Sequence, residues 1–168
     1  MEKEVFKGRG SRISPKNPYI KREEVIKNAV GIDEEKYLDK PVTKYFAENP
    51  VNALSKNDSP DLPLNYSVNP YQGCEHGCIY CYARNSHEYW GYSAGVDFES
   101  RIVVKKNAPA LLKKFFENKN WVPAPISLSG NTDCYQPIER KMQITRKLLE
   151  ICLEYRNPVG VLTKNALV

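Results

Sequence analysis

The spacing of hydrophobic and polar residues becomes regular from about residue 64 onwards. Alternating apolar positions and short runs of β-branched residues are typical of strands, and they occur in four segments of this part of the chain. These segments are 64–72 (LNYSVNPYQ), 101–107 (RIVVKKN), 125–133 (PISLSGNTD) and 158–168 (PVGVLTKNALV). We therefore predict four strands between residue 64 and the end of the sequence.

A helical period of 3.6 residues separates the later strands. Segment 107–120 (NAPALLKKFFENKN) predicts a helix with Asn107 as its N-terminal cap. Its apolar face consists of Leu111, Leu112, Phe115 and Phe116. Segment 137–157 predicts a second helix with Pro137 in its first turn. The apolar face of this helix comprises Ile138, Met142, Leu148, Leu149, Cys152 and Tyr155.

Strands that alternate with helices indicate βαβ crossovers, so we predict an α/β fold with a parallel sheet of about four strands. In such sheets binding sites gather at the carboxyl ends of the strands. Three segments follow strands here: the cysteine-rich loop at 74–81, SGNTD at 129–133 and TKN at 163–165. We expect these three segments to build one site.

The first 63 residues lack this regular pattern, and we predict that they form a basic N-terminal arm followed by a connector. The core domain is predicted at 64–168. Residues 1–22 hold seven Lys and Arg against two Glu, which accounts for the whole net charge of +5. Such an arm could attract nucleic acid, but a solvated, poorly ordered tail is the commoner outcome. Within the connector, 22–31 predicts a short helix that ends at Gly31, and 57–65 predicts a loop.

The lengths of the apolar runs indicate whether the chain enters a membrane or is secreted. No apolar run approaches the eighteen or so residues of a membrane helix, and the N-terminus lacks the apolar segment of a secretory signal. We therefore expect a soluble, cytoplasmic protein without a membrane partner. Since the cytosol keeps thiols reduced, clustered cysteines there are more often metal ligands than disulfides.

Cys74, Cys78 and Cys81 form the pattern C-x3-C-x2-C, and Gly73 and Gly77 allow the tight turns that would bring three thiolates together. Soft thiolates suit either zinc or an iron–sulfur cluster. A structural zinc site needs a fourth ligand, for which the sequence offers His76 or Cys134. An iron–sulfur cubane can instead leave one iron open for chemistry. Both alternatives stay open at this point.

The segment "CEHGCIYC" resembles the signature of the radical S-adenosylmethionine (radical SAM) enzymes. The longer pattern "NPYQGCEHGCIYCYAR", followed by "SGNTDCYQPIERKMQITRKLLE" and "VLTKN", is similar to the spore photolyase-like branch of that superfamily. The resemblance covers about residues 64–168. It implies a partial (β/α) barrel, of which the four strands would be the N-terminal part, because the barrels of this superfamily normally contain more.

The resemblance also implies cofactors. Cys74, Cys78 and Cys81 would hold three irons of a 4Fe-4S cluster, and the fourth iron would bind S-adenosylmethionine. An external electron donor would then drive cleavage of the sulfonium to methionine and a 5'-deoxyadenosyl radical. Further cofactor-binding residues implied in this way are Tyr80, near the adenine, Ser129, Asn131, Thr132 and Asp133 as polar groups, and Lys164 and Arg146 at the carboxylate.

Ordinary roles compete with several of these assignments. A strand-end Asp such as Asp133 is more often a cap or turn former, and a helical Arg such as Arg146 more often lies on a solvated face. Cys134 and Cys152 are expected to pack as small hydrophobic residues, and loop polarity accounts for His76. No catalytic side chain stands out.

Three functions follow from these observations. The first is a radical SAM enzyme acting on an unknown substrate, for which the resemblance suggests DNA-lesion repair, with nucleic acid and a second polypeptide that completes the barrel as candidate partners. The second is a zinc-stabilised structural or nucleic-acid-binding module. The third is an inactive truncated remnant that acts only through protein contacts.

Overall fold

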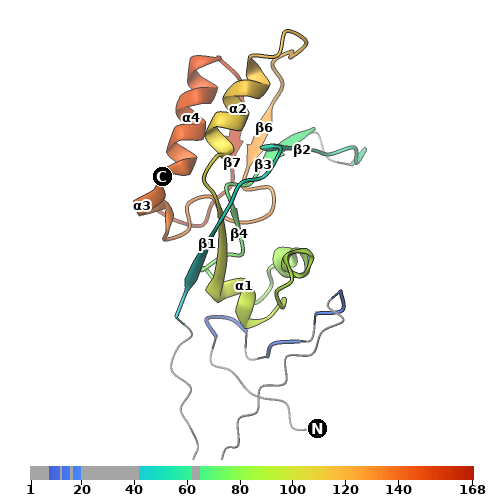
Figure 1. Ribbon diagram of the computed structural model, residues 1–168, viewed down its shortest axis with the longest axis vertical. Coiled ribbons are helices and arrows are strands. Elements are labelled where there is room, and N and C mark those ends of the chain that lie inside the picture. The colour runs from blue at the N-terminus through green and yellow to red at the C-terminus, as the bar shows by residue number, and fades with distance from the viewer. Residues whose placement is uncertain (1–7, 12, 16, 20–41, 62–64) are drawn as a thin grey trace, which may run out of the picture.

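Two small sheets organise the part of the chain that the computed structural model describes, which is residues 8–11, 13–15, 17–19, 42–61 and 65–168 (Figure 1). The first sheet has the order β1-β5-β4 and the second the order β2-β3-β6-β7. The strands of the first are β1 (Lys44–Glu48), β5 (Arg101–Lys105) and β4 (Tyr71–Gln72). Those of the second are β2 (Leu54–Lys56), β3 (Tyr66–Val68), β6 (Ile126–Leu128) and β7 (Val159–Val161).

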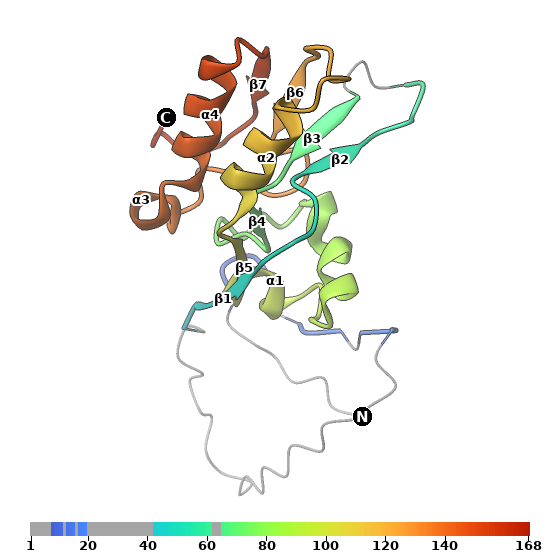
Figure 2. The ribbon, with the colours of Figure 1, turned by 45° about the horizontal axis from the view of Figure 1, so that its top comes forward.

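The second sheet confirms the prediction of an α/β fold with parallel strands. β3, β6 and β7 run parallel, with Val68 opposite Leu128 and Leu128 opposite Val161. β2 pairs with β3 in the antiparallel sense and forms one edge. Helices α2 (Ala108–Phe116) and α4 (Ile144–Glu154) pack side by side against this sheet (Figures 1 and 2). None of the described helices is long and apolar enough to cross a membrane.

The prediction that all four strands share one parallel sheet is wrong for Arg101–Lys105. This strand lies in the first sheet, where it is parallel to β1 and antiparallel to β4. The reason is a break at Asn69–Pro70 in the segment predicted as a single strand, since proline has no N–H for a sheet ladder. Residues before the break join β6, and residues after it join β5. The described residues therefore form two open sheets and no closed barrel.

Strands β1 and β2 fall in the range expected to be a connector. β1 is mostly exposed, so it shows no alternation of apolar and polar residues from which a strand could be predicted. Its order comes from pairing with β5 over five residues, Lys44 to Glu48. The predicted helix at 22–31 lies outside the described residues.

The described residues of the N-terminal arm contact the core, which contradicts the expectation of a solvated tail for this part. They run beneath α1 (Val96–Ser100) and the 3-10 helix η1 (Tyr82–Trp90). Asn17 donates from Nδ2 to the carbonyls of Glu88 at 2.9 Å and Tyr92 at 3.0 Å, and the ring of Tyr19 stacks on that of Tyr89.

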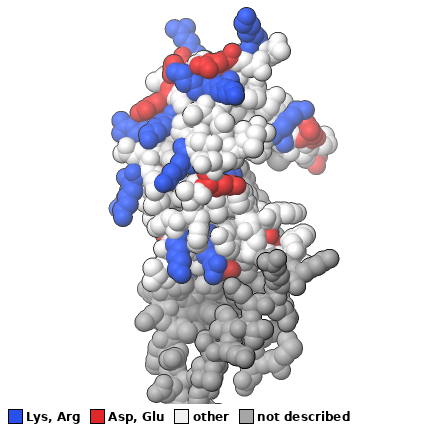
Figure 3. Space-filling view, in the orientation of Figure 1, with Lys and Arg blue, Asp and Glu red and all other residues white. Residues whose placement is uncertain are grey.

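The main core lies between the second sheet and the two long helices. Leu112 of α2 and Leu148 of α4 are fully buried against β3, β6 and β5, as predicted for their apolar faces. Cys152 is also buried there. Asn107 occupies the N-cap position of α2, but the prediction that its side chain caps the helix is wrong. Its Nδ2 donates instead to the carbonyl of Pro50 at 3.0 Å. The outer faces of these helices carry both signs of charge (Figure 3), with pairs such as Lys113–Glu154.

The single helix predicted at 137–157 is interrupted. Gln143 adopts φ 51° and ψ 35°, a left-handed conformation that separates α3 (Glu139–Met142) from α4. The buried carboxylate of Glu139 accepts hydrogen bonds from the N–H groups of Ile144 at 3.1 Å and Arg146 at 3.3 Å, and from the Tyr71 hydroxyl. Glu139 thus caps the second helix, a tertiary role that helical periodicity does not reveal.

Replacement of Gln143 by glycine is expected to stabilise the fold. A left-handed residue with a side chain costs about 1–2 kcal/mol, whereas the added chain entropy of glycine costs about 0.5–1 kcal/mol. The free energy of unfolding in urea should rise by about 0.5–1 kcal/mol. Lys147→Gly, in the regular part of α4, is the control and should lower it by about 1 kcal/mol. Equal losses in both variants would contradict this account of the break.

Candidate functional site

A cavity of about 210 Å³ opens where the loops that follow the strands meet. Its walls come from three segments: the cysteine loop after β4, the loop after β6 and the segment after β7. Lining residues include Cys74, Cys78, Cys81, Tyr80, Ser129, Asn131, Thr132, Asp133 and Lys164. The prediction that these three segments gather at one place is therefore confirmed.

Two glycines shape the cysteine loop. Gly73 and Gly77 have φ values of 78° and 60°, which residues with a Cβ rarely adopt. A Cβ on Gly73 would lie 3.0 Å from the carbonyl oxygens of Phe98 and Arg101. The N–H of Cys74 donates to the Phe98 carbonyl at 2.8 Å. The loop is thus held close to the end of α1, and its sulfur atoms face the cavity.

The three thiols are free and differ in exposure. Cys74 is buried, while Cys78 and Cys81 are partly exposed. Burial raises the pKa of Cys74 to about 11, although N–H groups of His76 and Asp133 directed at the sulfur oppose the shift. Cys74 is therefore protonated near pH 7, and a metal that binds it as thiolate must displace that proton.

The side chains of the described residues are not already arranged to bind a single metal ion. In the described part of the chain, which includes all five cysteines, no group of three or more His, Cys, Asp or Glu side chains is placed to hold a metal ion. The three cysteines of the motif lie along one cavity.

Asp133 joins the loop after β6 to the segment after β7. It accepts hydrogen bonds from the Thr163 hydroxyl at 2.7 Å, the Lys164 N–H at 2.8 Å and the Tyr135 N–H at 2.9 Å. Its Oδ2 also lies 3.4 Å from Nε2 of His76. Burial alone would raise the pKa of Asp133, but His76 and the three hydrogen bonds outweigh it and lower the pKa to about 2. Asp133 is therefore an ionised carboxylate that fixes the cavity wall.

Lys164 extends over the cysteine loop. Its Nζ lies 3.4 Å from Sγ of Cys78, donates to the Tyr80 hydroxyl, and sits 4.1 Å from the centre of the Tyr80 ring. The hydrogen bond with Tyr80 raises the pKa of Lys164. A cation and an exposed aromatic ring thus stand together at the rim of the cavity.

The remaining polar residues of SGNTD hydrogen-bond to neighbouring groups of the protein. The Ser129 hydroxyl accepts from the Cys134 N–H at 2.7 Å, and Thr132 donates to the Tyr71 carbonyl at 2.5 Å. Asn131 donates from Nδ2 to the Ser86 hydroxyl at 3.0 Å. These contacts shape the cavity wall directly.

Arg146 is not brought to the cavity. Its exposed side chain pairs with Glu150 at 3.0 Å on the surface of α4, and it lines a separate depression with Glu139 and Gln143. Cys134 also lies outside the lining, fully buried in the core, where burial raises its pKa to about 11.

Two lining residues lie outside the three segments that were expected to build the site: Tyr82 and Leu162. The hydroxyl of Tyr82 donates to the Gly130 carbonyl and so connects the cysteine loop to SGNTD. Its position directly after Cys81 was the only available signal. Thr163 belongs to the predicted segment TKN, but its hydrogen bond to Asp133, thirty residues away, has no signal in the sequence.

The fold and the cavity together define an α/β chain with mixed sheets and a site where a three-cysteine loop after β4 meets the carboxyl ends of the parallel strands β6 and β7. The chain is similar to an uncharacterized protein of Mycobacterium tuberculosis, with 36% identity over 107 residues, which are 64% of this chain and 32% of the relative. It is also similar to an uncharacterized protein of Methanocaldococcus jannaschii, with 34% identity over 128 residues, 76% of this chain and 44% of the relative.

The chain spans less than half the length of these curated relatives. No protein-family model and no solved structure matches it.

Proposed function

We propose that this chain is the cluster-binding part of a radical SAM enzyme of the spore photolyase-like type, with a partial (β/α) barrel as its fold. One observation carries the proposal: the C-x3-C-x2-C cysteines, in the loop after β4, line the same cavity as SGNTD and Lys164, which follow the parallel strands β6 and β7. The βαβ path from β3 to β7 supports the fold. The resemblance of "CEHGCIYC" supports the cofactor.

The donor set fits a 4Fe-4S cluster better than zinc. Tetrahedral zinc needs its sulfur ligands about 2.3 Å from one ion, and the described residues hold no such convergent group. In a cubane each thiolate binds a different iron, so the three thiols need not converge on one ion, and the three cysteines here line one cavity. We assign Cys74, Cys78 and Cys81 as the ligands.

When bound, the cluster supplies the electron that cleaves S-adenosylmethionine to methionine and a 5'-deoxyadenosyl radical. The residues of the chain would bind the cluster and S-adenosylmethionine and orient them. Cys74 releases its proton on ligation, since burial keeps it protonated beforehand. The exposed ring of Tyr80 offers a stacking face for adenine, and the ammonium of Lys164 offers a partner for the cofactor carboxylate.

We extend the proposal to the partners that the resemblance suggests: an external reductant, DNA lesions as substrate, and a second polypeptide that completes the barrel. The last has support from β7. It pairs with β6 on one side only among the described residues, and Leu162, which follows it, is 72% exposed. Such an edge can accept a further strand.

Product formation tests the proposal. The protein is purified and reconstituted without oxygen, reduced with dithionite and mixed with S-adenosylmethionine. We expect methionine and 5'-deoxyadenosine. A brown protein that forms neither product would leave cluster binding standing and overturn the enzymatic part, and a colourless protein with one zinc would establish the zinc module instead.

Lys164→Ala is expected to raise the KM for S-adenosylmethionine about 10- to 100-fold, because the cofactor carboxylate would lose a charged hydrogen-bond donor. The Lys164 N–H that donates to Asp133 belongs to the backbone and is unaffected. Iron content should stay at the wild-type level. Lys147→Ala on the exposed face of α4 is the control, and an unchanged KM in Lys164→Ala would refute the assignment.

A further inference from the structure

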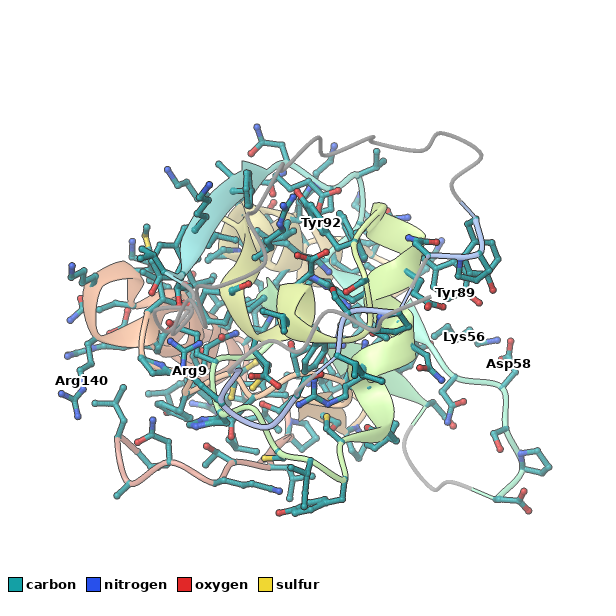
Figure 4. The ribbon with its side chains drawn as sticks, turned by 90° about the horizontal axis from the view of Figure 1, so that it is seen from below. Arg9, Lys56, Asp58, Tyr89, Tyr92 and Arg140 are labelled. Carbon is teal, nitrogen blue, oxygen red and sulfur yellow. The ribbon has the colours of Figure 1, made fainter. Side chains whose placement is uncertain are left out.

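Residues Gly8–Ser11, which we call the strap, are fastened beneath the cysteine loop (Figure 4, where Arg9 is labelled). The N–H groups of Arg9 and Gly10 donate to the carboxylate of Glu99 at 2.5 and 3.0 Å. Glu99 lies at the end of α1, and its side chain is completely buried. The guanidinium of Arg9 donates to the Glu99 carbonyl at 2.6 Å. The strap therefore binds a carboxylate ninety residues further along the chain.

The Glu99 carboxylate is also connected to the cysteine loop, through Arg84. Arg84 pairs with Glu99 at 2.6 Å, and its Nε and Nη2 donate to the carbonyl of Cys78 at 3.2 and 3.0 Å. A buried charge is stable only when it is paired and hydrogen-bonded, and Glu99 meets both conditions through the strap and Arg84. One continuous path of hydrogen bonds thus runs from the strap through Glu99 and Arg84 to Cys78.

The strap also touches the cysteine loop directly. A Cβ on Gly10 would overlap the carbonyl oxygen of Gly77, which lies between Cys74 and Cys78. A Cβ on Gly77 would in turn lie 2.5 Å from Cβ of Arg9. Glycine at both positions lets the two backbones approach closely, as neither side chain stands between them.

We propose that the strap and Glu99 position Cys78 for cluster ligation, an inference that rests on the proposed function. The loop from Cys74 to Cys81 contains no helix or strand, so its geometry depends on such contacts. Partners that orient metal ligands from behind typically change metal affinity 10- to 100-fold when they are lost. Residues 8–11 are therefore part of the metal centre although they lie over sixty residues before its first cysteine.

Gly10→Ala is the direct test, because its methyl group would overlap the backbone of Gly77 and approach the side chain of Ile79, both in the cysteine loop. Gly160→Ala is the matched control, since a Cβ there meets nothing within 4 Å. We expect iron release from reconstituted Gly10→Ala to a chelator to be about tenfold faster than from wild type or Gly160→Ala. The electron paramagnetic resonance spectrum of the reduced cluster should also change, and the melting temperature of the metal-free protein should fall, because the backbones at residues 10 and 77 must move apart.

Arg9→Ala serves as the second variant, because it keeps both strap N–H donors and removes only the guanidinium. Faster iron release from Arg9→Ala at a temperature well below its melting transition supports the proposal even if Gly10→Ala does not fold. Wild-type release rates and spectra in the folded variants would overturn it, including the case in which only the melting temperature falls. A wild-type chain that takes up no iron and sulfide would instead refute the proposed function itself.

Discussion

Cys78→Ala is expected to abolish cluster binding. The variant, purified and reconstituted without oxygen, should be colourless and should contain little iron and sulfide, whereas the wild type should be brown. Cys78 is the best position for this test because it is partly exposed and lines the cavity, whereas Cys74 is buried in a small apolar cluster with Ala83 and Phe98, and its removal would also disturb packing. Loss of one of three protein ligands leaves too few thiolates for a stable cubane.

Cys152→Ala is the matched control for this prediction. It removes a thiol of the same kind from the core beneath α4, away from the cavity. Iron and sulfide content should stay at the wild-type level, with only a modest loss of stability. Retention of the cluster by Cys78→Ala, or its loss from Cys152→Ala, would refute the ligand assignment.

The second large expected effect is a loss of folding stability at acidic pH. His87 is completely buried, with its ring 5.0 Å from that of Tyr92 and 5.6 Å from that of Phe98. Burial lowers the pKa of His87 from 6.5 to about 4, although the nearby Asp97 opposes the shift. Between these values the unfolded chain binds a proton that the folded chain does not. The free energy of unfolding should therefore fall as the pH drops from 6.5 to 4, by about 3 kcal/mol in total.

Urea unfolding at a series of pH values measures this loss. His87→Phe, which keeps an aromatic ring but cannot take up a proton, should remove most of the slope between pH 6.5 and 4. Asp133 does not interfere, because its folded pKa of about 2 places its own contribution below pH 3.8, where stability is lost as that carboxylate is protonated. The same slope in wild type and variant would mean that His87 is not its source.

The sequence predicted the parts of the fold that depend on local pattern. The strands at 126–128 and 159–161 and the helix at 108–116 follow from alternation and helical period. The meeting of SGNTD and TKN in one cavity follows from the rule that parallel strands place their carboxyl ends together. The cysteine loop joins them from β4 of the other sheet, so its place in the cavity does not follow from that rule.

Other features depend on contacts between distant residues. The pairing of β1 with β5 gives an exposed segment its strand conformation, and the strap owes its position to Glu99. Gln143 is left-handed because Glu139, held by Tyr71, caps the following helix. Arg146 is different, since Glu150 four residues later is a visible signal for a surface ion pair.

The most direct test of the central claim is the electron paramagnetic resonance spectrum of the reduced, reconstituted protein with and without S-adenosylmethionine. A cluster held by only Cys74, Cys78 and Cys81 leaves one iron for the cofactor. We therefore expect a signal of a reduced 4Fe-4S cluster whose shape and g values change when S-adenosylmethionine is added. A cluster signal that the cofactor leaves unchanged, or a protein without an iron signal, would contradict the account.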